Sequence, residues 1–98
     1  MQIIIAWSEN AARQYAALTP AQQVSARNLV QAIRLSPRAG HYYHIVTQRN
    51  GRTRAVWVAY GLAVRILFTL AEDGRGLIVQ IFDVASTDLP GIADYEEQ

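Results

Sequence analysis

The residues most suited to chemistry lie in one basic stretch near the middle of the chain, HYYHIVTQRNGRTRAVW (41–57). Arginine presents a planar fork of donors that can grip a phosphate in two places. Histidine transfers protons near neutral pH, and tyrosine can stack on unpaired bases. This combination suits the binding or cleavage of a nucleic acid. Charged residues also keep the solvated tip of a hairpin soluble, and this second interpretation fits Arg49 and Arg52 well.

Arg65 differs from the other arginines because it lies inside an apolar segment, LAVRILFTL (62–70). A buried arginine needs a partner. One interpretation is a structural ion pair with Glu72, Asp73 or Asp83. The interpretation that we favour is an open site for a phosphate or for the carboxylate of a partner protein.

Composition narrows the possible chemistry. The chain has 98 residues, a formal net charge of +1, nine basic residues that are all arginine, and no cysteine. Disulfides and thiolate metal sites are therefore excluded. His41 and His44 have no third ligand in the pattern, and no glycine-rich loop stands between a strand and a helix, so we predict neither a metal nor a cofactor. The longest apolar run is too short to cross a bilayer, and we expect a cytoplasmic protein.

Two helices are predicted in the first half of the chain. Ser8 is suited to cap a short helix over about residues 9–18, whose apolar residues fall on one face. The segment TPAQ (19–22) begins a second helix, since Thr19 and Gln22 can form a capping box around Pro20. SPRAG (36–40) ends that helix, because the residue before a proline resists helical angles.

The remainder reads as β-strands in the order β-α-α-β-β-β-β. The predicted strands cover residues 2–7, 42–49, 52–60, 62–70 and 76–84. We therefore predict a single α+β domain over residues 1–98, with a core over 1–84 and an acidic tail over 85–98. Its expected architecture is a twisted antiparallel sheet with the N-terminal two-helix hairpin packed on one face.

Turn positions predict which side chains share a face. A two-residue turn at Asn50-Gly51 pairs Arg49 with Arg52 and Thr47 with Arg54. A second such turn at Tyr60-Gly61 makes Arg54 and Arg65 neighbours across two strands. Under this register one face collects Tyr43, Arg49, Arg52, Arg54 and Arg65, and the other carries a core set of Val46, Trp57, Leu62, Val64, Ile66 and Phe68.

With these elements in order, the chain resembles the RelE/ParE superfamily of toxins from bacterial type II toxin–antitoxin pairs. The resemblance covers roughly residues 2–84. It consists of an opening strand ending in AWSENA, a helical hairpin closing with LSPRAG, the strand AVRILFTL, and the final strand GLIVQIFDV. It implies the same fold of a small twisted sheet with two helices on one side.

The resemblance also assigns roles residue by residue. Arg65 matches the central-strand arginine that contacts the scissile phosphate in RelE-like nucleases. Arg52 and Arg54 could stand where those enzymes place basic residues on the preceding strand. The segment after the last strand departs from the nuclease pattern, because DVASTDLPGIADY has no arginine or histidine.

The resemblance implies a toxin, and its leading interpretation is a ribosome-dependent mRNA endonuclease that uses no metal. An antitoxin encoded by an adjacent gene is the expected protein partner. The alternatives are a ParE-like inhibitor of DNA gyrase without nuclease activity, and a non-toxic binding module of the same fold. For the nuclease, the candidate catalytic residues are Arg65, Arg54 and His41, and the candidate nucleic-acid-binding residues are Arg49, Arg52, Arg54, Arg65 and Tyr43.

Overall fold

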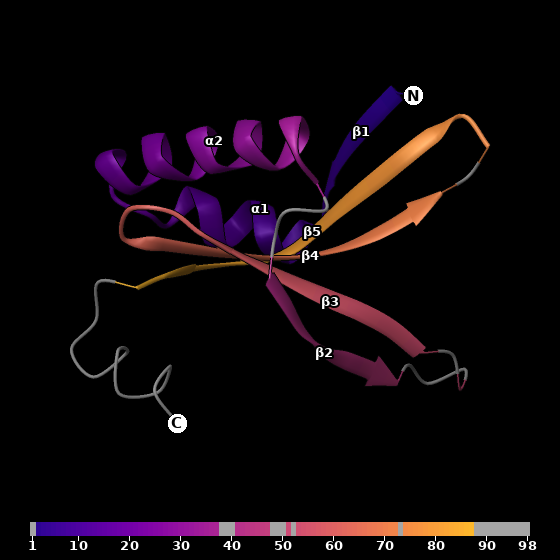
Figure 1. Ribbon diagram of the computed structural model, residues 1–98. Coiled ribbons are helices and arrows are strands. Elements are labelled where there is room, and N and C mark those ends of the chain that lie inside the picture. Colours follow the sequence, from indigo (N-terminus) through magenta and orange to yellow (C-terminus); the bar gives the residue numbers. More distant parts are fainter. Residues whose placement is uncertain (1, 38–40, 48–50, 52, 73, 88–98) are drawn as a thin grey trace.

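Two helices and five strands follow each other in the predicted order β-α-α-β-β-β-β (Figure 1). The computed structural model describes residues 2–37, 41–47, 51, 53–72 and 74–87, without the side chains of 41–47, 53 and 54. The elements are β1 (Gln2–Trp7), α1 (Glu9–Ala16), α2 (Pro20–Leu35), β2 (His41–Thr47), β3 (Thr53–Tyr60), β4 (Val64–Glu72) and β5 (Gly76–Ser86). The predicted tail begins two residues too early, because β5 continues to Ser86; residues 88–98 lie outside the described part.

Both helices begin at the predicted caps. The Ser8 hydroxyl accepts a hydrogen bond from the backbone of Ala11 at 3.0 Å. At the start of α2, the Thr19 hydroxyl accepts from the backbone N–H of Gln22 at 3.2 Å, and the Gln22 side chain accepts from that of Thr19 at 3.1 Å. The capping box is therefore complete, and it satisfies donors that the first helical turn leaves free. No helix among the described residues is long and apolar enough to span a membrane.

The five strands form one sheet in the order β1-β5-β4-β3-β2. β1 runs parallel to β5, and the other neighbours are antiparallel. The prediction of an antiparallel sheet is therefore wrong for the first strand, since the sheet is mixed. The α1–α2 hairpin between β1 and β2 carries the chain across the sheet, which lets the first and last strands meet side by side.

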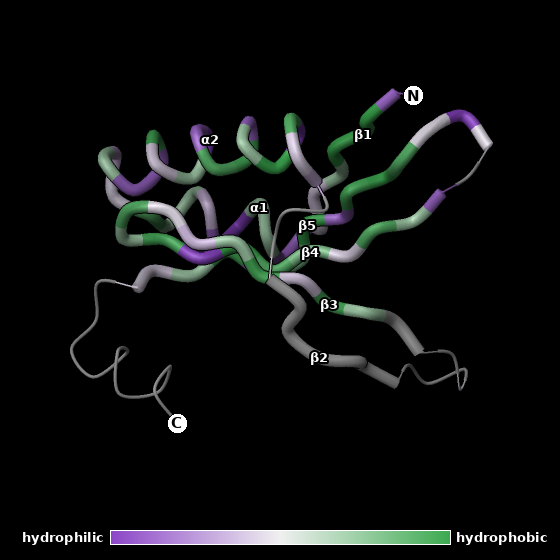
Figure 2. Tube along the Cα trace, in the orientation of Figure 1, coloured by the Kyte–Doolittle hydropathy of each residue, from purple (hydrophilic) through white to green (hydrophobic). Residues whose placement is uncertain are grey.

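The two helices lie on the same side of the sheet, above β4 and β5 in Figure 1. The β2–β3 hairpin diverges from this layer. Figure 2 shows hydrophobic residues concentrated where the helices meet β4 and β5. The buried core there consists of Ala11, Ala26, Leu29, Val30, Ile33, Val64, Ile66, Phe68, Val79, Ile81 and Val84.

The core prediction for the helix-facing side is confirmed for four of its members. Val64, Ile66 and Phe68 are buried, and Trp57 packs against them. The prediction is wrong for Leu62, whose side chain is 85% exposed. The reason is the turn between β3 and β4, which lies at Leu62-Ala63 instead of Tyr60-Gly61. The Gly61 N–H donates to the Val64 carbonyl at 2.9 Å across that turn. The side chain of Val46, the last predicted member, lies outside the described residues.

The register between β3 and β4 is shifted accordingly. Tyr60 pairs with Arg65 and Val58 with Leu67, so the predicted pairing of Val56 with Arg65 is wrong. The shift moves every pair by an even number of positions. Side chains alternate along a strand, so Arg65 still shares its face with Val56 and Val58. A separate apolar cluster of Val56, Val58 and Leu67 is buried on that face, with Phe82 packed against it.

The register between β2 and β3 differs from the prediction by one position from His44 to Thr47 and by two positions at His41 and Tyr42. Thr47 pairs with Thr53 and Val46 with Arg54, where the predicted pairs were Arg49 with Arg52 and Thr47 with Arg54. β2 ends at Thr47 and β3 begins at Thr53, and of the predicted Asn50-Gly51 turn only Gly51 belongs to the described residues. A further irregularity lies between Tyr42 and His44. The one-residue slip exchanges the faces on which the positions from His44 to Thr47 fall, whereas His41 and Tyr42, shifted by two positions, keep the faces of the predicted register.

Candidate functional site

Arg65 lies at the centre of a polar cluster that joins β4, β5 and α1. Its Nη2 donates to Oδ2 of Asp83 at 2.9 Å, and the two side chains are 29% and 22% exposed. The other carboxylate oxygen of Asp83, Oδ1, accepts from Nε2 of Gln14 at 2.7 Å. Both oxygens of this carboxylate therefore have partners within the chain.

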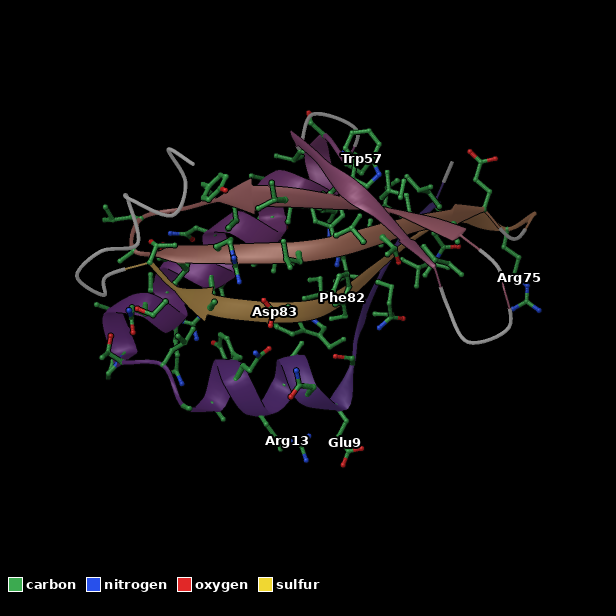
Figure 3. All side chains as sticks on the ribbon, turned by 90° about the horizontal axis from the view of Figure 1, so that it is seen from below. Glu9, Arg13, Trp57, Arg75, Phe82 and Asp83 are labelled. Carbon is green, nitrogen blue, oxygen red and sulfur yellow. The ribbon has the colours of Figure 1, made fainter. Side chains whose placement is uncertain are left out.

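Gln14 belongs to this cluster because of where β1 ends. The last pair between β1 and β5 is Trp7 with Ile81, so the edge of β5 beyond Ile81 has no neighbouring strand there. Gln14 on α1 occupies that edge, and its Oε1 accepts from the backbone N–H of Val84 at 2.9 Å. One amide thus replaces a strand partner and at the same time holds Asp83. Figure 3 shows α1 beside β5, with Asp83 on that strand and Glu9 and Arg13 directed away from the sheet.

The cluster agrees with the first interpretation of Arg65, in which this arginine forms a structural ion pair. Asp83, one of the three carboxylates predicted as partners, is joined to Arg65 in an ion pair, whereas Asp73 lies outside the described residues. Nε of Arg65 is buried and makes no hydrogen bond within the described part of the chain. A phosphate approaching this arginine would meet the negative charge of Asp83, which opposes its binding.

Arg54 and Arg65 do not lie beside each other. Arg65 pairs with Tyr60, and Arg54 stands six positions earlier on β3. At about 3.3 Å per residue this separates the two backbone positions by about 20 Å along the strand. Val56 and Val58, both buried, come between them. The predicted arginine pair is therefore wrong, because the turn lies later in the sequence than Tyr60-Gly61.

His44 lies on the other face of the sheet from the one predicted, and His41, whose side was left open, lies on the face of Arg65. His44 was expected opposite Trp57, on the face away from Arg65. The register instead pairs His44 with Val56 and His41 with Val58, and these valines share the face of Arg65. The backbone of His41 is then two strands away from Arg65, about 10 Å across the sheet.

The remaining predicted residues cannot be placed in the site. Arg49 and Arg52 lie outside the described residues, and for Arg54, His41 and Tyr43 the backbone alone is described. In the described part of the chain, no group of three or more His, Asp and Glu side chains could hold a metal ion.

Gln14 was not predicted as part of the site. It lies 69 residues before Asp83, and a neutral glutamine on a short helix gives no signal of its role. Ser8 takes part in the same docking of α1, since its backbone N–H donates to the Ile81 carbonyl at 2.8 Å. The role of Gln14 follows from the pairing of the strands, because the pairing shows where β1 ends and leaves the edge of β5 open for α1.

No protein-family model, no curated protein and no solved structure matches this chain. The resemblance to the RelE/ParE superfamily therefore stays a prediction from the residues quoted above.

Proposed function

We propose that this chain is the toxin of a RelE/ParE-like toxin–antitoxin pair and that it acts by binding a target protein, with DNA gyrase the leading candidate. The observation that carries the proposal is the Arg65–Asp83 ion pair, whose second carboxylate oxygen is held by Gln14. A nuclease needs an arginine whose charge is free to stabilise the transferring phosphate. A toxin that acts by binding a target protein does not need such a free arginine.

The order and layering of the elements support the toxin part of the proposal. The resemblance implies a small twisted sheet with a two-helix hairpin on one side, and the described elements have this arrangement at the coarse level. In this proposal the neighbouring gene encodes the antitoxin. It lays a helix or a strand over the sheet and the helical hairpin, with acidic groups near Arg54.

A metal-independent, ribosome-dependent mRNA endonuclease is the second candidate. The register supports it, because it pairs His41 with Val58 on the face of Arg65. Attack by a 2′-hydroxyl needs a base, and a histidine can serve as one near neutral pH. In this candidate a phosphate displaces Asp83 from Arg65, His41 takes the proton, and Arg49, Arg52, Arg54 and Tyr43 contact the RNA.

The deciding experiment induces the chain in cells with and without the neighbouring gene, and measures growth, transcript ends and gyrase supercoiling. We expect growth arrest that the neighbouring gene prevents, intact transcripts, and inhibition of purified gyrase at micromolar protein. Transcripts cut during arrest, with gyrase unaffected, would establish the nuclease instead. Harmless expression in both cases would leave a non-toxic binding module.

Arg65→Ala sharpens the choice between the two activities. The nuclease candidate predicts that this variant stays folded and loses toxicity, because the phosphate contact is gone. The binding proposal predicts that toxicity survives in Arg65→Ala wherever circular dichroism shows a native fold. The matched control is Arg75→Ala, which removes an arginine from the exposed turn between β4 and β5.

A further inference from the structure

A groove runs between α2 and the turn that joins β3 to β4. Its volume is about 360 Å³. Figures 1 and 2 show this turn, largely hydrophobic, below the N-terminal half of α2. At the rim of the groove Leu62 is 85% exposed and Val24 is 47% exposed. The described lining contains no charged residue, so the side chains that fill the groove should be apolar.

The end of β5 leads the chain directly to this groove. Nε2 of Gln22, in the first turn of α2, donates to the Ser86 hydroxyl at 2.7 Å. One residue later, the backbone N–H of Thr87 donates to the carbonyl of Ala63, the neighbour of Leu62, at 3.1 Å. Thr87 is the last described residue, and these two bonds hold it beside the rim of the groove. The next residues of the chain therefore start at the groove.

The sequence after Thr87 contains the apolar residues that the groove requires. Eleven residues follow, DLPGIADYEEQ (88–98), which we call the acidic segment. Leu89 stands two positions after Thr87, and Ile92 stands three positions after Leu89. Two residues of chain can reach about 7 Å, which is enough to bring Leu89 to Leu62. No other part of the chain is tethered so close to the groove by a described contact.

The charges of α2 and of the acidic segment are opposite. The charged residues of α2 are Arg27 and Arg34, and both are exposed. The charges of the acidic segment are all negative, at Asp88, Asp94, Glu96 and Glu97. A second copy of the chain would bring another α2 to the groove, and with it arginines that repel Arg27 and Arg34. The charges therefore favour the acidic segment over a second copy.

We propose that the acidic segment folds back into this groove, with Leu89 packed against Leu62. Its attachment at Thr87 gives it an effective local concentration on the order of millimolar, which exceeds that of a free partner at micromolar levels. A protein that binds this part of α2 has to displace the segment first. The segment thus regulates access to the helical side of the domain. This inference does not depend on the toxin proposal.

The test uses the full chain, which has no cysteine, so that one introduced cysteine carries a single spin label. The label is placed in the acidic segment at Ala93→Cys. We expect it to broaden the backbone NMR signals of Val24, Asn28 and Gly61, which line the groove. Leu89→Asp and Leu62→Asp should each weaken the docking at least about tenfold, as expected for the loss of one buried leucine, and should sharpen these signals.

Leu35→Asp is the matched control. Leu35 is 83% exposed, almost as much as Leu62, and it lies on α2 outside the groove lining. We expect the broadening in this variant to equal that of the parent chain. Circular dichroism should show a native fold for Leu62→Asp, because the replaced side chain is 85% exposed.

Three results would overturn the proposal. The first is groove signals that stay sharp with the label at Ala93→Cys. The second is equal sharpening by Leu35→Asp and Leu62→Asp, which would place the acidic segment elsewhere. The third is broadening of the same size in a mixture of isotope-labelled chain without a spin label and spin-labelled chain without the isotope. That result would assign the groove to a second copy.

Discussion

Arg65 is a charged residue in the middle of an apolar strand. The carboxylate of Asp83 compensates its charge there by forming an ion pair with it. The carboxylate is held from two sides, by Arg65 on β4 and by Gln14 on α1. Three separate elements thus depend on one side chain. The same contacts that support the fold also oppose the entry of a phosphate.

Asp83→Ala leaves Arg65 and Gln14 without their acceptor. We expect a loss of about 1–2 kcal/mol in the free energy of unfolding. This value lies at the lower end of the range for hydrogen bonds to charged groups, because the pair is partly exposed to solvent. Urea unfolding measures it, and a double-mutant cycle with Arg65→Ala should give a coupling of about 1 kcal/mol. Glu9→Ala is the control, since Glu9 is exposed on α1. An Asp83→Ala variant as stable as Glu9→Ala would contradict this prediction.

Gly76 marks a close approach between backbones. It pairs with Gln2 where β1 meets β5, and an added Cβ would overlap the Gln2 carbonyl oxygen. We expect Gly76→Ala to cost about 2 kcal/mol, of the size seen for overpacking, and to lower Tm by about 10 °C. Gly74→Ala is the comparison, because nothing lies within 4 Å of its added Cβ and only its φ of +86° opposes the change. Equal losses in the two variants would refute the steric explanation.

At the scale of elements, the turn between β3 and β4 determines which residues of these two strands lie opposite each other. Its central residues are Leu62 and Ala63, although Tyr60-Gly61 contains the glycine that favours a turn. Ala63 has a φ of +64°, in the left-handed region that residues with a Cβ seldom adopt. The hydrogen bonds from α2 and β5 to this turn compensate for the strain. Tertiary contacts therefore overrule the local signal.

Ala63→Gly should stabilise the chain, because glycine adopts this φ without a steric penalty. We expect a gain of about 0.5 kcal/mol after the added freedom of the unfolded chain is subtracted, or about 2–4 °C in Tm. The control is Ala71→Gly in β4, where Ala71 is exposed in an ordinary strand. That change should lower Tm. A lower Tm in Ala63→Gly as well would mean that the turn is not strained.

At the scale of the whole molecule, the sheet has two unlike faces. One is covered by α1 and α2 and contains the larger core. The other carries the smaller cluster of Val56, Val58 and Leu67 together with Arg65. Of the chain's residues 51% are hydrophobic, and Leu62 and Val24 are among the large hydrophobic residues that lie exposed.

Binding of the proposed antitoxin should raise the stability of the whole domain. At a concentration one hundred times its Kd, a ligand that binds only the folded state adds about 2.7 kcal/mol. For a domain of this size we expect Tm to rise by at least about 10 °C. Differential scanning fluorimetry with the product of the neighbouring gene measures the shift, and an unrelated acidic protein is the control. Equal behaviour of the two would count against the proposed partner.

The sequence by itself determined the elements of this protein. Helix caps at Ser8 and Thr19, β-branched strands and alternating apolar residues are local signals, because each depends on neighbours a few positions apart. They predicted the element order, the α+β class and most of the core on β4. They also predicted that Arg65 lies on the face away from the helices, since alternation along a strand survives an even shift in register.

Only the tertiary structure decided how the strands pair and what Arg65 contacts. The parallel pairing of β1 with β5, the turn at Leu62-Ala63 and the end of β1 beside Ile81 all depend on residues far apart in the chain. These features separate Arg54 from Arg65 and bring Gln14 to Asp83. A register can change by a few positions with little effect on local preferences, so packing between distant segments had to select it.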